Sequence, residues 1–130
     1  MDMPAYGARW WAPRHGAVLT VTGRASGQPI SIPVAVTPFR DREYLVSMLG
    51  PSVNWVRSVR AAAGLATLRR HGRDETVRLH EVEAARRAEI LRRYVAVAPG
   101  ARPHIGLGPR DALASFDRVA GDHPVFRITR

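Results

Sequence analysis

Five basic and hydroxyl side chains near the predicted ends of strands are the residues of this sequence whose chemistry points to a ligand. They are Arg24, Ser26, Ser47, Arg57 and Arg60. Guanidinium groups, hydroxyls and backbone N–H groups are the donors that a phosphate or another anion requires. Trp55 offers a flat apolar face beside them. A barrel with an adjacent helix would gather these groups around a phosphate-bearing ligand, whereas the alternative is a surface hairpin with one exposed arginine.

Other kinds of site find no support in the sequence. The chain has no cysteine, which excludes disulfides, thiolate nucleophiles and thiolate metal ligands. Its five histidines lack the spacing of a metal site, and no glycine-rich nucleotide motif and no G-x-S-x-G occurs. The formal net charge is +9, with every basic residue an arginine, which favours an anionic partner such as a phosphorylated cofactor, nucleic acid or acidic lipid.

The segment around Arg24 and Ser26 has the pattern of a β-hairpin. Residues 30–36 alternate with the period of a strand that buries one face, and residues 18–21 form a second apolar run. Two glycines give the connection 22–29 its backbone freedom. We expect this connection to present backbone N–H groups, the serine hydroxyl and the guanidinium together.

The rest of the chain predicts further short strands and helices. Expected strands are 43–48, 65–70, 75–82 and 124–129, with a turn at 39–42; expected helices are one from a Ser52 N-cap to a stop at Gly64, one at 84–98 and one at 111–120. Residues 99–110 are rich in proline and glycine, and we expect a loop that no helix crosses. Short strands joined mostly by hairpins favour an antiparallel barrel, mainly β within the α+β class, with helices packed outside.

The length of the chain, residues 1–130, fits a single domain. No apolar run has the length of a membrane span and no signal peptide is visible, so we expect a cytoplasmic protein. We expect residues 1–16 to be irregular. Two tryptophans among them lie between arginines, a mixture suited to covering one end of a barrel or, as the less favoured alternative, to loose association with a membrane.

The segment 22–29, with Pro33 after it, resembles the opening motif of the deazaflavin-dependent nitroreductase family, LTTTGRKSG-x-P. Ser47 and Trp55 resemble the family's next block, and the similarity runs from about residue 17 to the closing strand. The resemblance implies a split β-barrel like that of FMN-binding, pyridoxamine-phosphate-oxidase-like proteins. It also implies coenzyme F-420, a deazaflavin with a phosphate and an oligoglutamate tail, and hydride transfer to a quinone, nitro compound or other conjugated acceptor, with a homodimer as the expected assembly.

The resemblance carries cofactor-binding roles over to eight residues. They are Arg24, Ser26, Pro33, Val34, Ser47, Trp55, Arg57 and Arg60. The first two would hold the phosphate or tail, and Trp55 would close the groove from its helix. His104, in the loop 99–110, is the expected polar contact of the acceptor, and neither a catalytic acid or base nor a metal site is assigned.

The sequence departs from the family at three positions where relatives carry a cation, here Ala25, Ile30 and Met48. Arg57 and Arg60 are the residues that would compensate. Two alternatives stay open: an FMN-type or non-catalytic binder on the same fold, and a basic nucleic-acid-binding barrel. We do not expect nucleic acid as a partner, because the arginines are spread along the chain rather than gathered and aromatic residues are few.

Overall fold

The computed structural model describes residues 14–130, and their strands form one antiparallel sheet. In chain order the strands are β1 (Gly16–Thr22), β2 (Pro29–Ala35), β3 (Thr37–Phe39), β4 (Arg42–Val46), β5 (Leu65–Arg70), β6 (Arg73–Glu81) and β7 (Val125–Thr129). Their order across the sheet is β2-β1-β5-β6-β7-β4-β3, and all neighbouring pairs are antiparallel. The predicted antiparallel architecture and both predicted hairpins are confirmed.

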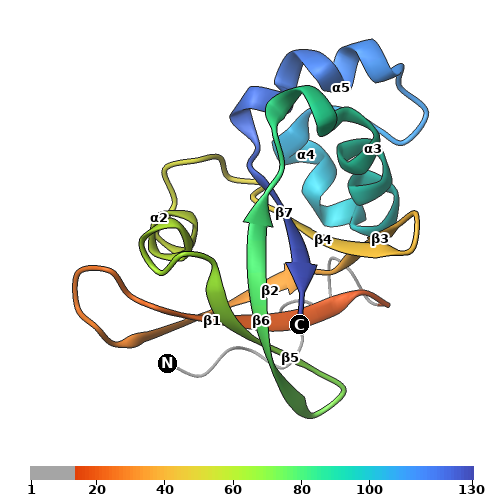
Figure 1. The fold of residues 1–130 in the computed structure, drawn as a ribbon. Helices are drawn as coiled ribbons and strands as arrows, with labels where there is room; N and C mark the ends of the chain where they lie inside the picture. Colours follow the sequence, from red (N-terminus) through yellow and green to blue (C-terminus); the bar gives the residue numbers. More distant parts are fainter. Residues whose placement is uncertain (1–13) are drawn as a thin grey trace.

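The two edge strands follow each other in the chain, and this curls the sheet. Only Val36 separates the end of β2 from the start of β3, although these strands lie at opposite ends of the order. The Val36 N–H donates to the His15 carbonyl at 2.8 Å, and β2 also contacts β4. The sheet is therefore bent into an open barrel, as Figure 1 shows.

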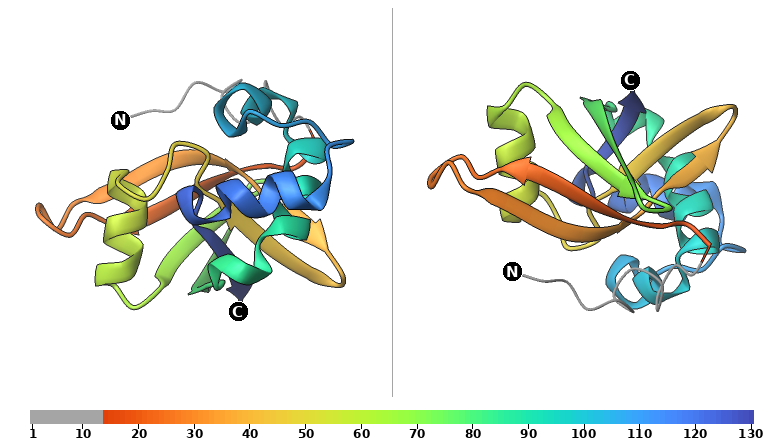
Figure 2. Two further views of the ribbon diagram at one scale, coloured as in Figure 1. Left: turned by 90° about the horizontal axis from the view of Figure 1, so that it is seen from above. Right: turned by 90° about the horizontal axis from the view of Figure 1, so that it is seen from below.

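The helices pack around this barrel. Helix α2 (Asn54–Ala61) follows β4, and between β6 and β7 lie the 3-10 turn η1 (Ala84–Arg86), α3 (Ala88–Val97), η2 (Pro99–Ala101), α4 (Arg102–Ile105), α5 (Leu113–Val119) and η3 (Ala120–Asp122). Helices α3, α4 and α5 lie together on one side of the molecule, and α2 lies on the other (Figure 1). The β1–β2 connection projects from the body beside α2 (Figure 2).

Alternation along β4 separates two hydrophobic clusters. Leu45 belongs to the inner cluster, which residues of β1, β2, β5, β6, β7 and α2 complete. Tyr44 and Val46 belong to the outer cluster, where α3, α4 and α5 cover the sheet. This division confirms the predicted strand in 43–48. Because β4 is buried on both sides, one strand separates the surroundings of α2 from those of the other helices.

Two local predictions fail where the sequence carries a misleading signal. The turn at 39–42 is narrower than predicted, because Phe39 ends β3 and pairs with Arg42; the turn residues Arg40 and Asp41 have φ of 48° and 64°, which side-chain-bearing residues rarely adopt. The predicted Ser52 N-cap is wrong: Val53 occupies that position and no side chain caps the helix. The helix does end before Gly64, whose N–H donates to the Val59 carbonyl at 2.9 Å.

The predicted helix 84–98 is interrupted at Arg87, which separates η1 from α3. Its buried side chain donates to the carbonyls of Val82 at 2.7 Å and Ala120 at 2.9 Å, so the break is held in part by a contact with a residue far away in sequence. The prediction that no helix crosses 99–110 is also wrong, because α4 lies there and buries Ile105.

The predictions for the N-terminal segment can be compared with the structure only from residue 14 onward. Gly16 already belongs to β1, so the predicted irregular segment 1–16 is too long by one residue. The two tryptophans, predicted to cover one end of the barrel or, as the less favoured alternative, to contact a membrane, lie outside the described residues. Between residues 14 and 130 no helix has the length and apolar character needed to cross a membrane.

Candidate functional site

The connection between β1 and β2 is fastened to α2 by one hydrogen bond. The backbone N–H of Arg24 donates to the Oγ of Ser58 at 3.2 Å, and Ser58 is fully buried. Within the connection, the Gly27 N–H donates to the Gly23 carbonyl at 2.8 Å. A Cβ at position 23 would lie 2.9 Å from Ser26 Oγ and 3.1 Å from the Gln28 carbonyl oxygen, so a side chain there would require its neighbours to shift. The hydrogen bond to Ser58 ties the connection to the helix.

Arg24 and Ser26 have different parts in this connection. Ser26 Oγ accepts a hydrogen bond from the Gln28 N–H at 3.1 Å, so the hydroxyl already helps to shape the turn. The Arg24 side chain is exposed and forms no ion pair with any residue of 14–130. The guanidinium thus has no carboxylate partner within residues 14–130.

Helix α2 turns Val56 and Val59 into the inner cluster and leaves Arg57 exposed on the opposite face. Trp55 is half-buried, with its ring centroid 5.7 Å from that of Phe126 and the two planes tilted by 55°. This contact is an ordinary tilted aromatic packing, and it fixes the indole on the barrel while part of it stays open to solvent. Trp55 therefore offers a rigid apolar surface.

Arg60 is engaged by a carboxylate of β6. Its Nε and Nη2 donate to the two oxygens of Glu81 at 2.9 and 2.7 Å, and Arg87 Nη2 donates to the same carboxylate at 3.3 Å. The hydrogen bonds from Arg60 hold the pKa of Glu81 below its ordinary value. Of the two arginines on α2, Arg57 alone has no ion-pair partner among the described residues.

Pro33 and Val34 lie in β2, which within residues 14–130 pairs with β1 on one side only. Val34 is buried in the inner cluster, and Ile30 and Ile32 of the same strand pack against that cluster while half-exposed. Pro33 is half-buried and faces the other way, opposite Val18 in the register. The predicted alternation of this strand is confirmed, and it leaves apolar surface near α2.

Ser47 follows β4 and is almost completely buried. Its hydroxyl donates to the Gly50 carbonyl at 2.5 Å, and its backbone N–H donates to the Pro124 carbonyl at 2.9 Å. The Ser47 carbonyl accepts from His123 Nδ1 at 3.1 Å. One hydrogen bond to the loop after β4 and two to the segment before β7 therefore hold this residue in place.

His104 lies on α4 and is exposed. The next residue, Ile105, is buried in the outer cluster, against which Met48 and Leu107 also pack. The segment 99–110 thus shares a hydrophobic cluster with Met48, which lies just after β4 and next to Ser47.

The structure joins Arg24 to α2 through Ser58. None of the eight predicted cofactor residues lines either of two hollows on the surface of the described residues. The larger is a groove of about 790 Å³ between the β3–β4 hairpin, β6 and the start of α3. The smaller, of about 60 Å³, lies between the start of β1 and the β5–β6 turn. Sequence reasoning missed the large groove because its residues come from seven separate elements and form no motif.

Comparisons with known proteins agree with this architecture. Among solved structures, "F420-H2 Dependent Reductase (FDR-A)" is 18% identical with a TM-score of 0.61, covering 89% of this chain and 95% of that one. A chain described as a domain-swapped dimer gives the same identity and TM-score, with coverage of 89% and 81%. A protein of the pyridoxinephosphate oxidase family from Clostridium acetobutylicum, related to general stress protein 26, is 12% identical with a TM-score of 0.55 and coverage of 88% and 74%. These likenesses confirm the predicted split β-barrel.

No protein with a curated description matches the sequence. The sequence profile of one family, described as "F420H(2)-dependent quinone reductase", matches residues 5–104, which is most of the chain. That description confirms the predicted F-420 cofactor and the predicted oxidoreductase activity at the level of the family. This chain belongs to the F420H(2)-dependent quinone reductase family.

Proposed function

We propose that this protein transfers hydride from reduced F-420 to a small conjugated acceptor of the quinone or nitro type, and that F-420 binds beside α2 and the β1–β2 connection. The hydrogen bond from the Arg24 N–H to Ser58 Oγ carries the assignment of the site. It joins the segment that bears Arg24 to the helix that bears Arg57. Both arginines are therefore next to the half-exposed apolar surface of β2 and α2.

The side chains of this region suit an acidic cofactor with a flat ring. A phosphate and a glutamate tail require cations and N–H donors, and two exposed arginines without carboxylate partners among residues 14–130 supply them. A ring requires apolar contact, which the half-buried Trp55 and Ile32 supply. We assign Arg24, Ser26 and Arg57 to the anionic part, Pro33, Val34 and Trp55 to the ring, and flanking positions to Ser47 and Arg60.

Bound F-420 supplies an obligate hydride donor, so the residues of this chain mainly position the reactants and exclude water. Trp55 is rigid because it packs on Phe126, and it limits where a ring lies. Arg24 orients the anionic end, since its backbone is anchored to Ser58. We propose that 99–110 covers the acceptor, with His104 as a polar contact, because Met48 and Ile105 belong to one cluster.

We also propose that the protein is a homodimer with a small-molecule electron acceptor. A domain-swapped dimer among the structural neighbours supports the first part, and the family's name supports a quinone as the second. Light scattering on the purified protein measures the assembly directly. A monomer at micromolar concentration contradicts the dimer without bearing on the cofactor site.

Titration of the protein with F-420 tests the cofactor site. In a variant with phenylalanine at positions 10 and 11, Trp55 is the sole tryptophan, and we expect F-420 to quench its fluorescence. Arg24→Ala is expected to weaken binding by about 1.5–3 kcal/mol, the usual worth of a hydrogen bond to a charged group. Its stability should stay near that of the parent, because the side chain is exposed.

Arg118→Ala is the matched control, since Arg118 is an exposed arginine on α5 without an ion pair among the described residues. FMN is titrated in parallel, because FMN binding without F-420 binding would favour the flavin alternative. Absence of quenching by either compound at high micromolar concentration would show that this region is not a cofactor site.

A further inference from the structure

The groove of about 790 Å³ lies on the face of the sheet opposite to the proposed cofactor site. Phe126 and Arg127 are consecutive in β7, so their side chains point to opposite faces. Phe126 packs with Trp55 in the inner cluster, whereas Arg127 lines the groove. A ligand in the groove is therefore separated from Trp55 by the thickness of the sheet.

A row of three side chains from adjacent strands crosses the floor of the groove. Arg127 of β7 is directly opposite Tyr44 of β4 on one side and His80 of β6 on the other. Tyr44 is buried and Arg127 is half-buried, and His80 Nε2 and Thr129 Oγ1 are hydrogen-bonded at 2.8 Å. The floor thus has a cationic residue, Arg127, in the middle of the row.

The charges around this floor are not balanced by one another. Four arginines and three glutamates line the groove. Arg40 forms an ion pair with Glu89 at 3.3 Å, and its Cζ lies 5.2 Å from the centroid of the Phe39 ring. Glu81 accepts hydrogen bonds from Arg60 and Arg87, which do not line the groove.

Three of the lining arginines and one lining glutamate have no ion-pair partner among residues 14–130. The arginines are Arg42, Arg86 and Arg127, and the glutamate is Glu83. The unpaired groups are therefore predominantly cationic, and they come from β4, η1 and β7 on different sides of the groove. Such convergent guanidinium groups recognise a carboxylate.

Apolar side chains complete the lining. Phe39 is half-buried on the hairpin wall, and Ile90 is buried at the start of α3. Leu113 adds a half-buried side chain at the start of α5. The volume lies within the range of small-molecule sites, which typically combine apolar walls with a few placed polar groups.

We propose that this groove is a second ligand site, which takes an organic anion that joins an aromatic or alicyclic ring to a carboxylate. Arg127 and Arg42 contact the carboxylate, and Tyr44, Phe39 and Ile90 contact the ring. The site does not depend on F-420 binding, so it stands or falls separately from the proposed function.

Titration with 1-naphthoate, followed calorimetrically and by amide chemical shifts, tests the proposal, with uncharged 1-naphthamide as the matched ligand. We expect naphthoate to bind and to shift the amides of Tyr44, His80 and Arg127. Naphthamide, which lacks the charge, should bind at least about tenfold more weakly. Arg127→Met removes the charge but leaves a long side chain, and it should weaken the binding of naphthoate by a similar factor.

Arg73→Met is the control, because Arg73 is exposed at the distant β5–β6 turn. If Arg127→Met unfolds, Arg42→Met replaces it, since Arg42 is exposed at the start of β4. Equal affinities for naphthoate and naphthamide, unchanged affinity in the folded arginine variant, or shifts confined to α2 and the β1–β2 connection would each overturn the proposal.

Discussion

The backbone N–H of Arg24 lies 3.2 Å from the Oγ of Ser58 and joins the first hairpin to helix α2. Ser58→Ala removes the acceptor and releases the connection from the helix. We expect this variant to lose about 0.5–1.5 kcal/mol of the free energy of unfolding, the usual net worth of one hydrogen bond. Its affinity for F-420 should fall as well, because Arg24 is no longer held in place. Urea unfolding and Trp55 fluorescence measure the two effects.

Ser115→Ala provides the comparison, since Ser115 is a half-buried helical serine on α5 whose hydroxyl forms no hydrogen bond with the described residues. If Ser58→Ala binds F-420 as tightly as the parent protein, the anchoring of the connection has no part in cofactor binding.

Arg60 is assigned a flanking position because Glu81 already accepts hydrogen bonds from its Nε and Nη2. Arg60→Ala is therefore expected to weaken F-420 binding less than Arg24→Ala does. The free energy of unfolding should fall by less than about 1 kcal/mol, since the arginine side chain is 45% exposed and such ion pairs are worth little. An equal loss of affinity in the two variants would mean that Arg60 contacts the cofactor despite Glu81.

The parts of the fold that the sequence predicted are those that depend on local patterns. Alternation identified β1, β2 and β4, and helical spacing identified the stripe of Val56 and Val59, because each pattern is a direct consequence of burying one face. The interruption at Arg87 was not predictable in this way. Its cause is hydrogen bonds to Val82 and Ala120, and the second of these is 33 residues away.

The candidate site was predictable to a similar extent. The motif at 22–29 located the connection and its arginine, yet nothing in the sequence tells that Ser58 anchors it or that Glu81 engages Arg60. Both contacts depend on how α2 packs on the sheet. The groove around Arg127 was missed for the same reason, since strand register, and not spacing along the chain, assembles its floor.

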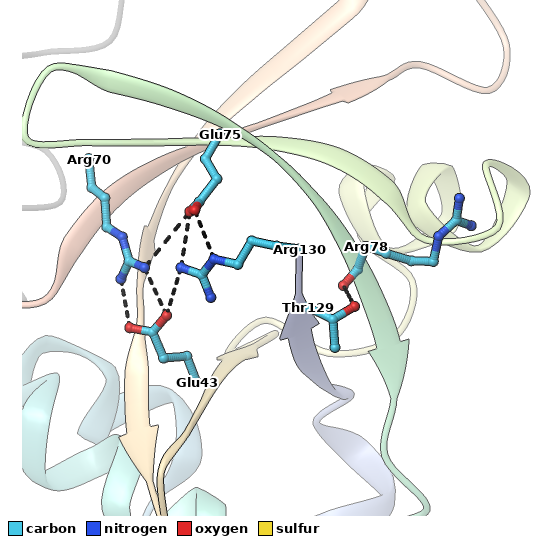
Figure 3. Close-up of polar contacts among 6 residues, drawn as sticks. All are labelled: Glu43, Arg70, Glu75, Arg78, Thr129 and Arg130. Atoms are coloured by element: carbon cyan, nitrogen blue, oxygen red, sulfur yellow. Dashed lines mark hydrogen bonds and ion pairs between the residues drawn. The ribbon is translucent and has the colours of Figure 1, made fainter.

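An ionic network of four residues predicts how stability depends on pH (Figure 3). Arg70 donates to the two oxygens of Glu43 at 2.7 and 2.8 Å, and Arg130 donates to Glu75 at 2.8 and 3.0 Å. Hydrogen bonds from Arg70 lower the pKa of Glu43, and those from Arg130 lower the pKa of Glu75, both from an ordinary value of 4.5.

Because these pKa values are lower in the folded state than in the unfolded chain, the network stabilises the fold above the ordinary carboxyl pKa and loses this contribution as the pH falls below it. We expect Tm, followed by circular dichroism, to decrease between about pH 5 and pH 3. Glu43→Gln should flatten that decrease, whereas Glu83→Gln, an exposed glutamate outside the network, should not. The same pH dependence in both variants would contradict the assignment.

Gly64 is packed directly against the backbone of β6. A Cβ at position 64 would lie 2.2 Å from the Leu79 carbonyl oxygen, and the φ of Gly64 is +86°. Gly64→Ala must therefore displace β6 or the end of α2, and we expect it to lose about 2–4 kcal/mol of the free energy of unfolding. Gly72→Ala is the matched variant, because its φ of +74° is similar but no atom lies within 4 Å of the added Cβ, so it should lose only about 1 kcal/mol. Urea unfolding compares the two, and equal losses would show that the left-handed backbone alone, and not the contact with Leu79, requires glycine at position 64.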